Sequence, residues 1–252
     1  MKNREVLGID FGGSGIKGAP IDIKRGVLLT ERYRIPTPSP ATPDAVADTI
    51  NKIVQHFNWK GPIGVGFPAV VINGVIKTAS NIDKGWIDKN AQKIFSKKTK
   101  LPVKVINDAD AAGVAEKKFG VGKEAKGNVI LVTVGTGIGT VLFNGNKLVP
   151  NTELGHVFLE NSLTAEKYAA DSVRQTEGLD WTQWGKRFNV YLKEIEKLFW
   201  PELIIIGGGV SKKKEKFIHA ININTKIKMA KLKNEAGIIG AAIAASRLKS
   251  KK

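Results

Sequence analysis

The chain lacks cysteine altogether, so none of its 252 residues can form a disulfide or a thiolate metal site. This absence is typical of proteins from a reducing compartment, and we expect a cytoplasmic location. Long apolar runs are absent too: no stretch approaches the roughly 20 residues that a membrane helix needs, and we expect no membrane contact. The charged residues before Val6 lead directly into an apolar strand, which predicts no signal peptide.

Acidic residues are scarce relative to basic ones. Forty lysines and arginines against 23 aspartates and glutamates give a net charge of +17 and a pI near 9.9. A field of this sign attracts polyanions such as nucleic acid, an anionic membrane or polyphosphate; the alternative is a solvated surface without a partner. The lysines are spread along the chain without a basic helical pattern that interleaves aromatics, so nucleic acid is not the expected partner.

One stretch organises the chain: residues 6–18, with the sequence VLGIDFGGSGIKG. It begins as a buried strand and continues, after Asp10, into a glycine-rich turn that contains Ser14 and Lys17. Glycine lets a ligand approach the main chain closely, and free N–H groups beside a hydroxyl and an ammonium group suit a phosphate. The Walker A spacing is absent and residues 19–21 read as strand, which argues against a Walker A loop and a Rossmann fingerprint.

A second hairpin of the same kind occupies residues 129–141, with the sequence VILVTVGTGIGTV. Either hairpin alone could be a plain glycine-rich turn, but the pair indicates two lobes of one architecture with a phosphate chain between them. Elsewhere strands alternate with helices, so the fold class is α/β. The expected helix Trp181–Trp200 has an aromatic face that also includes Leu198, and we interpret this face as core or dimer surface.

Local signals predict further elements. Thr42 can cap a helix that has Pro43 as its first residue. The Asn73-Gly74 pair between two short apolar segments predicts a tight hairpin. Further helices are expected over Asp88–Lys98 and Thr164–Arg174.

The pair Asn107-Asp108 follows a short buried strand and opens a helix. Asn and Asp are both favoured as helix N-caps, which is one interpretation of the pair. The other is a general base at the end of a strand, where α/β proteins bind their ligands and where a phosphoryl acceptor hydroxyl would lose its proton. The positive end of the helix would keep Asp108 ionised at neutral pH.

Five motifs occur in the order found in the ROK family of sugar kinases, which the chain resembles over nearly its whole length. They are Asp10-Phe11-Gly12-Gly13, Asn107-Asp108-Ala109, Gly135-Thr136-Gly137-Ile138-Gly139, Glu153-Leu154-Gly155-His156 and Gly207-Gly208-Gly209. The resemblance is strongest to the polyphosphate glucokinases of that family, also called polyphosphate glucomannokinases. It implies the two-lobed actin-like ATPase fold, a ribonuclease H-like fold, of the sugar kinase, Hsp70 and actin superfamily.

The same resemblance implies where the lobes lie. Residues 1–112 would form a small N-terminal lobe with the first phosphate hairpin, and the C-terminal helix, 238–252, would pack back on it. Residues 113–237 would form a large C-terminal lobe with the second phosphate hairpin and a dimer surface.

Roles for individual residues also follow from the resemblance. Asp108 would be the catalytic base that acts on the sugar 6-hydroxyl. The sugar ligands would be Asn81, Asp83, Asn107, Glu153, His156 and Glu160. The phosphate-binding residues would be Asp10, Gly12, Gly13, Ser14, Gly15, Lys17, Thr133, Gly135, Thr136, Gly137 and Lys84. A nucleotide-side turn would be formed by Gly207, Gly208 and Gly209, for which a tight strand-to-helix connection is the alternative.

The implied cofactor is Mg²⁺, held near Asp10 directly or through water, and the implied phosphoryl donor is polyphosphate, ATP or both. Typical ROK kinases follow the Gly-His pair with a cluster of zinc-binding cysteines. This chain has no cysteine, so no zinc is expected there. The polyphosphate-using subgroup also lacks the cluster, which favours that subgroup over an ATP-only ROK kinase.

The expected activity is therefore transfer of the terminal phosphoryl group of polyphosphate to the 6-hydroxyl of glucose, giving glucose 6-phosphate, with mannose left open as a second acceptor. An ATP-dependent ROK hexokinase is the alternative. A sugar-sensing ROK regulator is less favoured, because the first hairpin begins within ten residues of Met1 and leaves no room before it for a DNA-binding domain. A filament-forming actin relative is weakened by the sugar-type motifs. The expected partners are glucose, inorganic polyphosphate and a second copy in a homodimer.

Overall fold

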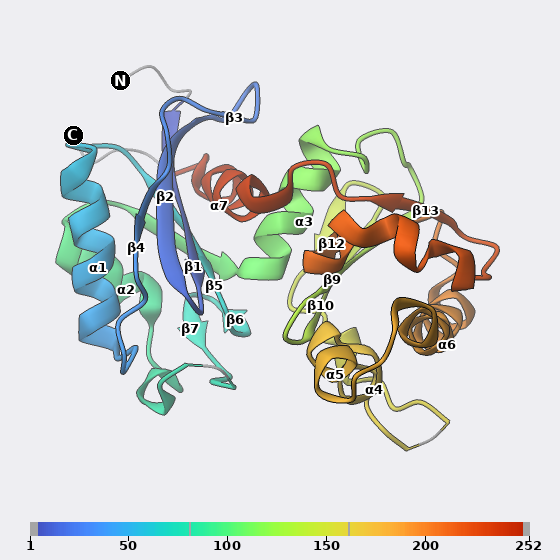
Figure 1. The fold of residues 1–252 in the computed structure, drawn as a ribbon. Helices are drawn as coiled ribbons and strands as arrows, with labels where there is room; N and C mark the ends of the chain where they lie inside the picture. The colour runs from blue at the N-terminus through green and yellow to red at the C-terminus, as the bar shows by residue number, and fades with distance from the viewer. Residues whose placement is uncertain (1–4, 81, 161, 249–252) are drawn as a thin grey trace. The chain divides into compact units, whose positions relative to one another are not determined.

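The computed structural model describes residues 5–80, 82–160 and 162–248. The chain divides into two compact units. Unit 1 comprises the described residues up to Ala115 together with those from Asn234 onward, and unit 2 comprises Glu116–Lys233. Figure 1 shows the helices and strands of each unit.

Unit 1 is built on a six-stranded sheet with the order β3-β2-β1-β5-β8, to which β4 adds by pairing with β2. Strands β1, β5 and β8 run parallel, so their carboxyl ends lie at one edge of the sheet. The strand bounds are β1 Glu5–Gly12, β2 Gly15–Asp22, β3 Val27–Leu28, β4 Tyr33–Ile35, β5 Ile63–Phe67 and β8 Val103–Asn107.

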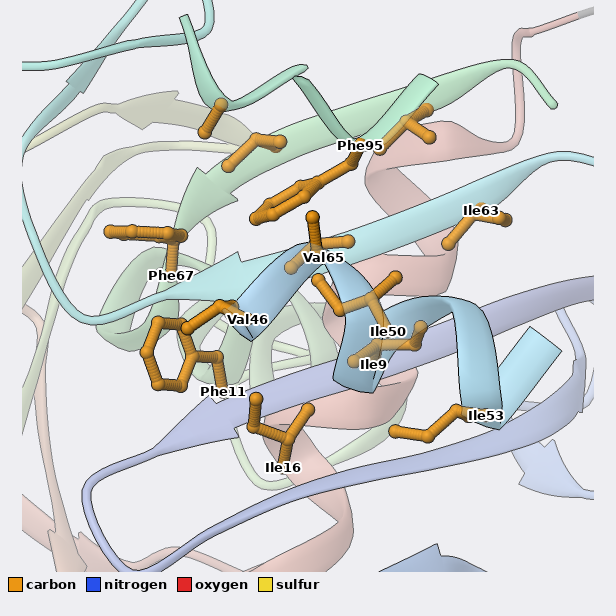
Figure 2. Close-up of a cluster of buried hydrophobic side chains, with 14 of the residues drawn as sticks. Ile9, Phe11, Ile16, Val46, Ile50, Ile53, Ile63, Val65, Phe67 and Phe95 are labelled. Carbon is orange, nitrogen blue, oxygen red and sulfur yellow. The ribbon is translucent and has the colours of Figure 1, made fainter. Parts of the chain in front are cut away.

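Helices α1 (Pro43–His56) and α2 (Ala91–Thr99) supply the core on one face of this sheet. Figure 2 shows their apolar side chains interdigitating with those of β1, β2 and β5. As predicted, Thr42 caps α1 and Pro43 is its first residue, where a missing N–H costs nothing.

Helix α7 (Ala236–Ala245) lies against β1 and β5 in unit 1. The approach is close: a Cβ on Gly8 would lie 2.0 Å from the carbonyl oxygen of Ile238, and one on Gly64 would lie 1.8 Å from that of Ala241. Glycine on both strands therefore lets the helix backbone touch the sheet. The helix predicted over 238–252 differs from α7, which begins at Ala236 and ends at Ala245; positions 249–252 of that prediction lie outside the described residues.

Two further features of unit 1 depend on residues with positive φ. The Asn73-Gly74 turn between β6 (Val71–Ile72) and β7 (Val75–Ile76) is confirmed, with φ values of 51° and 81° that suit a tight hairpin. A helix expected from Asp88 instead begins at Ala91. Asp88 has a φ of 58°, and Asn90 provides the N-cap.

Unit 2 is built on a five-stranded sheet with the order β11-β10-β9-β12-β13. Its strands are β9 Asn128–Val134, β10 Ile138–Asn144, β11 Lys147–Val149, β12 Leu203–Gly208 and β13 Lys226–Met229. As in unit 1, an antiparallel hairpin of the first two strands is followed along the sheet by two parallel strands. The same strand order in both sheets is the internal repeat that the two glycine hairpins predicted.

Helix α6 (Trp181–Phe199) fills the core of unit 2 with its aromatic face, as predicted. The rings of Trp184 and Phe188 stack with centroids 5.0 Å apart. Leu198, expected on the same face, is instead 52% exposed.

The remaining short elements of unit 2 differ from the single helix expected over 164–174. That segment forms α4 (Ala165–Ala169) and α5 (Asp171–Thr176), separated by the extended Ala170.

Helix α3 (Asp108–Phe119) begins in unit 1 and ends in unit 2. The short 3₁₀ helices are η1 Lys84–Trp86, η2 Leu154–His156, η3 Gly209–Lys216, η4 Ile218–Ala220 and η5 Lys233–Glu235. Across the described ranges, no helix has both the length and the apolar character needed to cross a membrane.

Candidate functional site

The first glycine turn joins β1 to β2 in unit 1 and is held by two side chains from outside the hairpin. The Thr37 hydroxyl donates to the carbonyl oxygen of Gly12 at 2.6 Å, and the Arg34 guanidinium donates to that of Ser14 at 2.5 Å. Arg34 also covers Gly15, because a Cβ there would lie 2.5 Å from its Nε. The turn therefore has a fixed backbone with a cation beside it.

Charged side chains form a row on one face of the unit 1 sheet. The strand register places Arg34 beside Lys17, and Lys17 beside Asp10. Lys17 Nζ lies 3.3 Å from Asp10 Oδ2, and both side chains are largely shielded from solvent, at 22% and 18% exposure. The next position in the row is Gly66 of β5, which has no side chain.

Asp108 begins α3 on the same face of the sheet. Strand register pairs Gly66 with Asp10 of β1 and with Ile106 of β8, and a Cβ on Gly66 would lie 3.5 Å from Cα of Asp108, so Gly66 lies between Asp10 and Asp108. Both carboxylates stand at or next to the carboxyl ends of parallel strands, the edge where α/β sheets bind ligands. Unit 1 thus brings the expected base and the expected phosphate residues together.

Of the two interpretations of Asn107-Asp108, the structure shows the helix cap, and the general base stays a prediction. Asn107 is the helix cap: its Oδ1 accepts from the backbone N–H of Asp110 at 3.0 Å, and its Nδ2 donates to the carbonyl of Ala69 at 3.0 Å. The Asp108 carboxylate accepts from the N–H of Ala109 at 2.8 Å and is only partly buried. Because Asn107 provides the cap, the Asp108 carboxylate can act as a base at the positive end of α3.

The loop with the expected sugar residue Asp83 and the expected phosphate residue Lys84 is anchored by Trp86. The indole is fully buried and its Nε1 donates to the carbonyl of Ala41 at 2.9 Å. Asp83 caps η1 by accepting from the N–H of Gly85 at 2.7 Å, and Lys84 is exposed. Asn81, also expected to bind sugar, lies outside the described residues.

The second glycine turn, Gly135 to Gly137 in unit 2, is also held from outside its hairpin. Ser172 of α5 donates its N–H to Gly135 O at 3.2 Å and its hydroxyl to Thr136 O at 2.6 Å. Glu166 of α4 accepts from the N–H of Ile138 at 2.8 Å, and a Cβ on Gly137 would lie 2.3 Å from its Oε2. Thr133 stands at the base of the turn, where its hydroxyl donates to Gly139 O at 3.3 Å.

Glu153 and His156 lie together in unit 2 beside Glu166. His156 Nδ1 is 3.6 Å from Glu153 Oε2, and both side chains are partly exposed. Burial raises the pKa of Glu153 above its usual value of 4.5; nearby His156 opposes the rise and the charge of Glu166 adds to it. Glu160, the third expected sugar ligand here, is exposed.

The third glycine turn, Gly207 to Gly209, lies beside the second one. Strand pairing places Gly207 opposite Thr133 and Gly208 opposite Val134. Gly208 has a φ of 76°, and a Cβ on it would lie 2.3 Å from the carbonyl oxygen of Val134. Gly208 therefore has a structural reason to be glycine, in agreement with the alternative of a tight connection between elements.

Three other glycines of the turns have neither a steric nor a backbone reason to be glycine. A Cβ on Gly13, Gly135 or Gly209 would meet no described atom within 4 Å, and none of the three has a positive φ. One of them stands in each glycine turn. Missing side chains at open turn positions with ordinary backbone angles fit turns that a ligand approaches closely.

The donor set of unit 1 fits magnesium brought in with a phosphate substrate. Mg²⁺ is commonly held by one or two carboxylates together with substrate phosphates and water, and Asp10 supplies a carboxylate next to the first glycine turn. Throughout the described ranges, no cluster of three or more histidine, aspartate or glutamate side chains could hold a metal by itself.

Four residues that hold or flank the glycine turns were not identified from the sequence: Arg34, Thr37, Glu166 and Ser172. Arg34 and Thr37 lie 20 and 25 residues from their partners in the first turn. Only the pairing of β4 with β2 brings Arg34 to the turn, and the motif spacing contains no signal of it.

The comparisons with known proteins agree with these motifs. The ROK family model matches residues 6–177. Polyphosphate glucokinase of Mycobacterium tuberculosis (strain CDC 1551 / Oshkosh) is 45% identical over 96% of this chain and 91% of its own length. Polyphosphate glucokinase of Mycobacterium leprae (strain TN) is 44% identical over 95% of this chain and 74% of its own length.

Among solved structures, the inorganic polyphosphate/ATP-glucomannokinase of Arthrobacter sp. strain KM superimposes with a TM-score of 0.91. It is 42% identical and covers 96% of this chain and 98% of its own. The expected fold class, α/β with the actin-like ATPase fold, is thereby confirmed. The match of the family model over more than half of the sequence and the near full-length relatives show that this chain belongs to the ROK family.

Proposed function

We propose that this chain is a polyphosphate-dependent glucokinase, which transfers the terminal phosphoryl group of polyphosphate to the 6-hydroxyl of glucose. The observation that carries the proposal is the placement of Asp108 directly after β8, across Gly66 from Asp10 of β1, the strand that leads into the first glycine turn. A carboxylate next to phosphate-binding groups is what a phosphoryl acceptor hydroxyl requires. The near full-length likeness to proteins named polyphosphate glucokinase supports the choice of donor and acceptor.

In the proposed reaction Asp108 accepts the proton of the sugar 6-hydroxyl. The sugar oxygen forms a bond to the terminal phosphorus, the bond from that phosphorus to the bridging oxygen breaks, and the shortened polyphosphate leaves. Lys17 and Arg34 compensate negative charge on the phosphates. Mg²⁺, held by Asp10 and the phosphates, would supply further charge neutralisation of the transferring group.

Recognition of the sugar is assigned to Glu153 and His156, whose polar atoms are partly exposed and close together. Three further residues are proposed as sugar ligands: Asn107, Asp83 and Glu160. They differ in how many of their polar atoms are already engaged within the protein. Asn107 already uses both ends of its amide to cap α3 and to hold Ala69, so its remaining amide hydrogen and lone pair would serve the sugar. Asp83 has one carboxylate oxygen engaged with Gly85.

ATP is proposed as a second donor and mannose as a second acceptor, because the similar Arthrobacter protein is named a polyphosphate/ATP-glucomannokinase. The third glycine turn would then lie on the nucleotide side. We further propose a homodimer in the cytoplasm, the location that the absence of cysteine favours.

The test is formation of glucose 6-phosphate with polyphosphate, ATP and GTP supplied one at a time, with glucose and mannose as acceptors and with and without Mg²⁺. Asp108→Asn is the matched control, because it keeps the size of the side chain and removes the base. Turnover with polyphosphate that disappears in the control supports the proposal. Turnover with ATP alone would replace it with the ATP-dependent hexokinase, and glucose binding without any turnover would favour a sugar-sensing regulator.

A further inference from the structure

Residues 212–233 of unit 2 follow the third glycine turn and carry a large excess of positive over negative charge. This segment contains eight lysines against one glutamate, a net charge of +7 out of +17 for the whole chain. The lysines are Lys212, Lys213, Lys214, Lys216, Lys226, Lys228, Lys231 and Lys233, and we call them the basic track. Within the part of the chain that the structure describes, none of the eight has an ion-pair partner.

The fold connects both parts of this track to the third glycine turn. Helix η3 begins at Gly209, so its four lysines follow the turn directly. On the other side of the turn, a Cβ on Gly207 would lie 3.6 Å from Cβ of Ala230, and the N–H of Ala230 donates to Ile206 O at 2.9 Å. Lys231 comes next in the chain. Strands β12 and β13 run parallel, so the lysines that follow each of them lie at the same end of the sheet.

The track continues away from the turn along β13, the edge strand of the sheet. Ile227 and Met229 pack against the core of unit 2, so the alternating Lys226 and Lys228 project from the opposite face. The start of the strand is fixed, because Glu196 of α6 accepts from both the N–H and the hydroxyl of Thr225 at 2.5 and 2.7 Å. A strand of four residues extends the row of lysines by about 13 Å.

We infer that the basic track binds the part of a long polyphosphate chain that extends beyond the glycine turns. This inference rests on the proposed function and adds the route of the donor. A linear polyanion with a charge on every phosphate fits a row of lysines that lack ion-pair partners and start at a phosphate-binding turn. A short donor would end near the turns and would not reach β13.

Edge strands also benefit from lysine for another reason, because charge prevents pairing with a second chain. That explanation covers Lys226 and Lys228 but not the lysines of η3 or those after β13. The two explanations differ in outcome: loss of edge protection causes aggregation without changing donor affinity, whereas loss of the track weakens long donors specifically.

The test compares two triple variants of unit 2 that remove the same charge. The track variant replaces Lys226, Lys228 and Lys231 with Gln. The control variant replaces Lys147, Lys193 and Lys197 with Gln. Lys147 lies on β11, the opposite edge strand, and the other two lie on α6. Circular dichroism and light scattering establish that both variants are folded and not aggregated.

The KM for long-chain polyphosphate and for tripolyphosphate is measured at low and high salt. Between 50 and 200 mM salt the native KM for long chains should climb about 20-fold more than that of the track variant, since each phosphate contact of a single strand adds about 0.7 to the salt slope. Tripolyphosphate kinetics should be unchanged, and the control variant should behave like the native protein. Parallel salt curves for the track and control variants, or an equal effect on both donors, would overturn the inference.

Direct binding separates this inference from the proposed function. Fluorescence anisotropy of labelled long-chain polyphosphate reports on the track without any turnover. If the native protein binds the labelled chain through the track but transfers no phosphoryl group from it, the proposed donor is wrong and the binding surface stands. Equal binding by native protein and track variant overturns the surface whatever the activity.

Discussion

Replacing the glycines of the turns with alanine separates their structural use from their use in binding. An added Cβ on Gly13 or Gly135 would have no described atom within 4 Å, and neither residue has a positive φ, so an alanine fits the folded chain. Such a substitution usually stabilises a protein by about 0.4–1 kcal/mol, because alanine restricts the unfolded chain. Gly13→Ala and Gly135→Ala should therefore unfold at the native temperature or slightly above it.

Gly208→Ala is the structural counterpart. Its φ of 76° and ψ of −167° belong to a region that only glycine adopts easily, and the added Cβ would lie 2.3 Å from Val134 O. A backbone held in such a region costs about 1–3 kcal/mol. For a chain of this size that corresponds to a fall in Tm of very roughly 2–12 °C, at about 2–4 °C per kcal/mol.

The activity of the folded protein should not follow this order of stability. The methyl group of Gly13→Ala or Gly135→Ala occupies space that we assign to the phosphate donor, and a misplacement of about 1 Å can cost roughly 10²-fold in rate. We therefore expect kcat/KM for polyphosphate to fall by about that factor in variants that are fully stable. Thermal unfolding by circular dichroism and a coupled glucose 6-phosphate assay measure the two quantities. Native activity in both alanine variants would refute the assignment of these turns to the donor.

Three further predictions concern single side chains. Asp108→Asn should lower kcat by about 10²–10⁴-fold with glucose binding retained, as loss of a general base predicts, and a near-native kcat in the folded variant would contradict the role. Burial raises the pKa of Glu153 above its usual 4.5 in the folded protein. Its protonated form therefore contributes its whole stabilisation below pH 4.5, and this contribution is lost as the pH rises through the raised pKa. Glu153→Gln should therefore gain Tm relative to the native protein between pH 4.5 and neutrality while its KM for glucose rises, and a Tm difference independent of pH would argue against that account. Arg34→Gln should raise KM for the donor more than KM for glucose, whereas Thr37→Val, which only loses a bond to the turn, should affect both less; equal changes in the two variants would reduce Arg34 to a structural brace.

Local chemistry made much of the fold predictable. The Thr42-Pro43 start of α1 and the Asn73-Gly74 hairpin each depend on a few adjacent residues whose preferred backbone angles are known. The start of α2 was misplaced because Asp88 looks like a first-turn residue, yet tertiary structure holds it at a φ of 58°. The aromatic face of α6 was recognised from its spacing, but spacing could not reveal that Leu198, in the last turn of the helix, stays exposed.

The candidate site was predictable where its residues are contiguous and not where they converge. The glycine turns and the Asn107-Asp108 pair are contiguous in the sequence, and the structure shows Asn107 as the helix cap, whereas the base role of Asp108 stays a prediction. Arg34 and Glu166 reach their turns through strand register and through the position of α4, over separations of 20 and 28 residues. A single sequence contains no measure of such distances.

The two hairpins repeat one backbone design with side chains of opposite charge beside it. In unit 1 the cations Arg34 and Lys17 flank the turn, and in unit 2 the carboxylate of Glu166 holds the strand that leaves it. A carboxylate in that position repels phosphate, so a phosphate at the unit 2 turn would depend on backbone N–H groups and on cations other than Glu166's neighbours in α4. The lysines that follow Gly209 and Ala230 are the cations closest in sequence to the adjacent turn. Under the inferred route of the donor, the lysines of the basic track would supply the positive charge that the unit 2 turns lack.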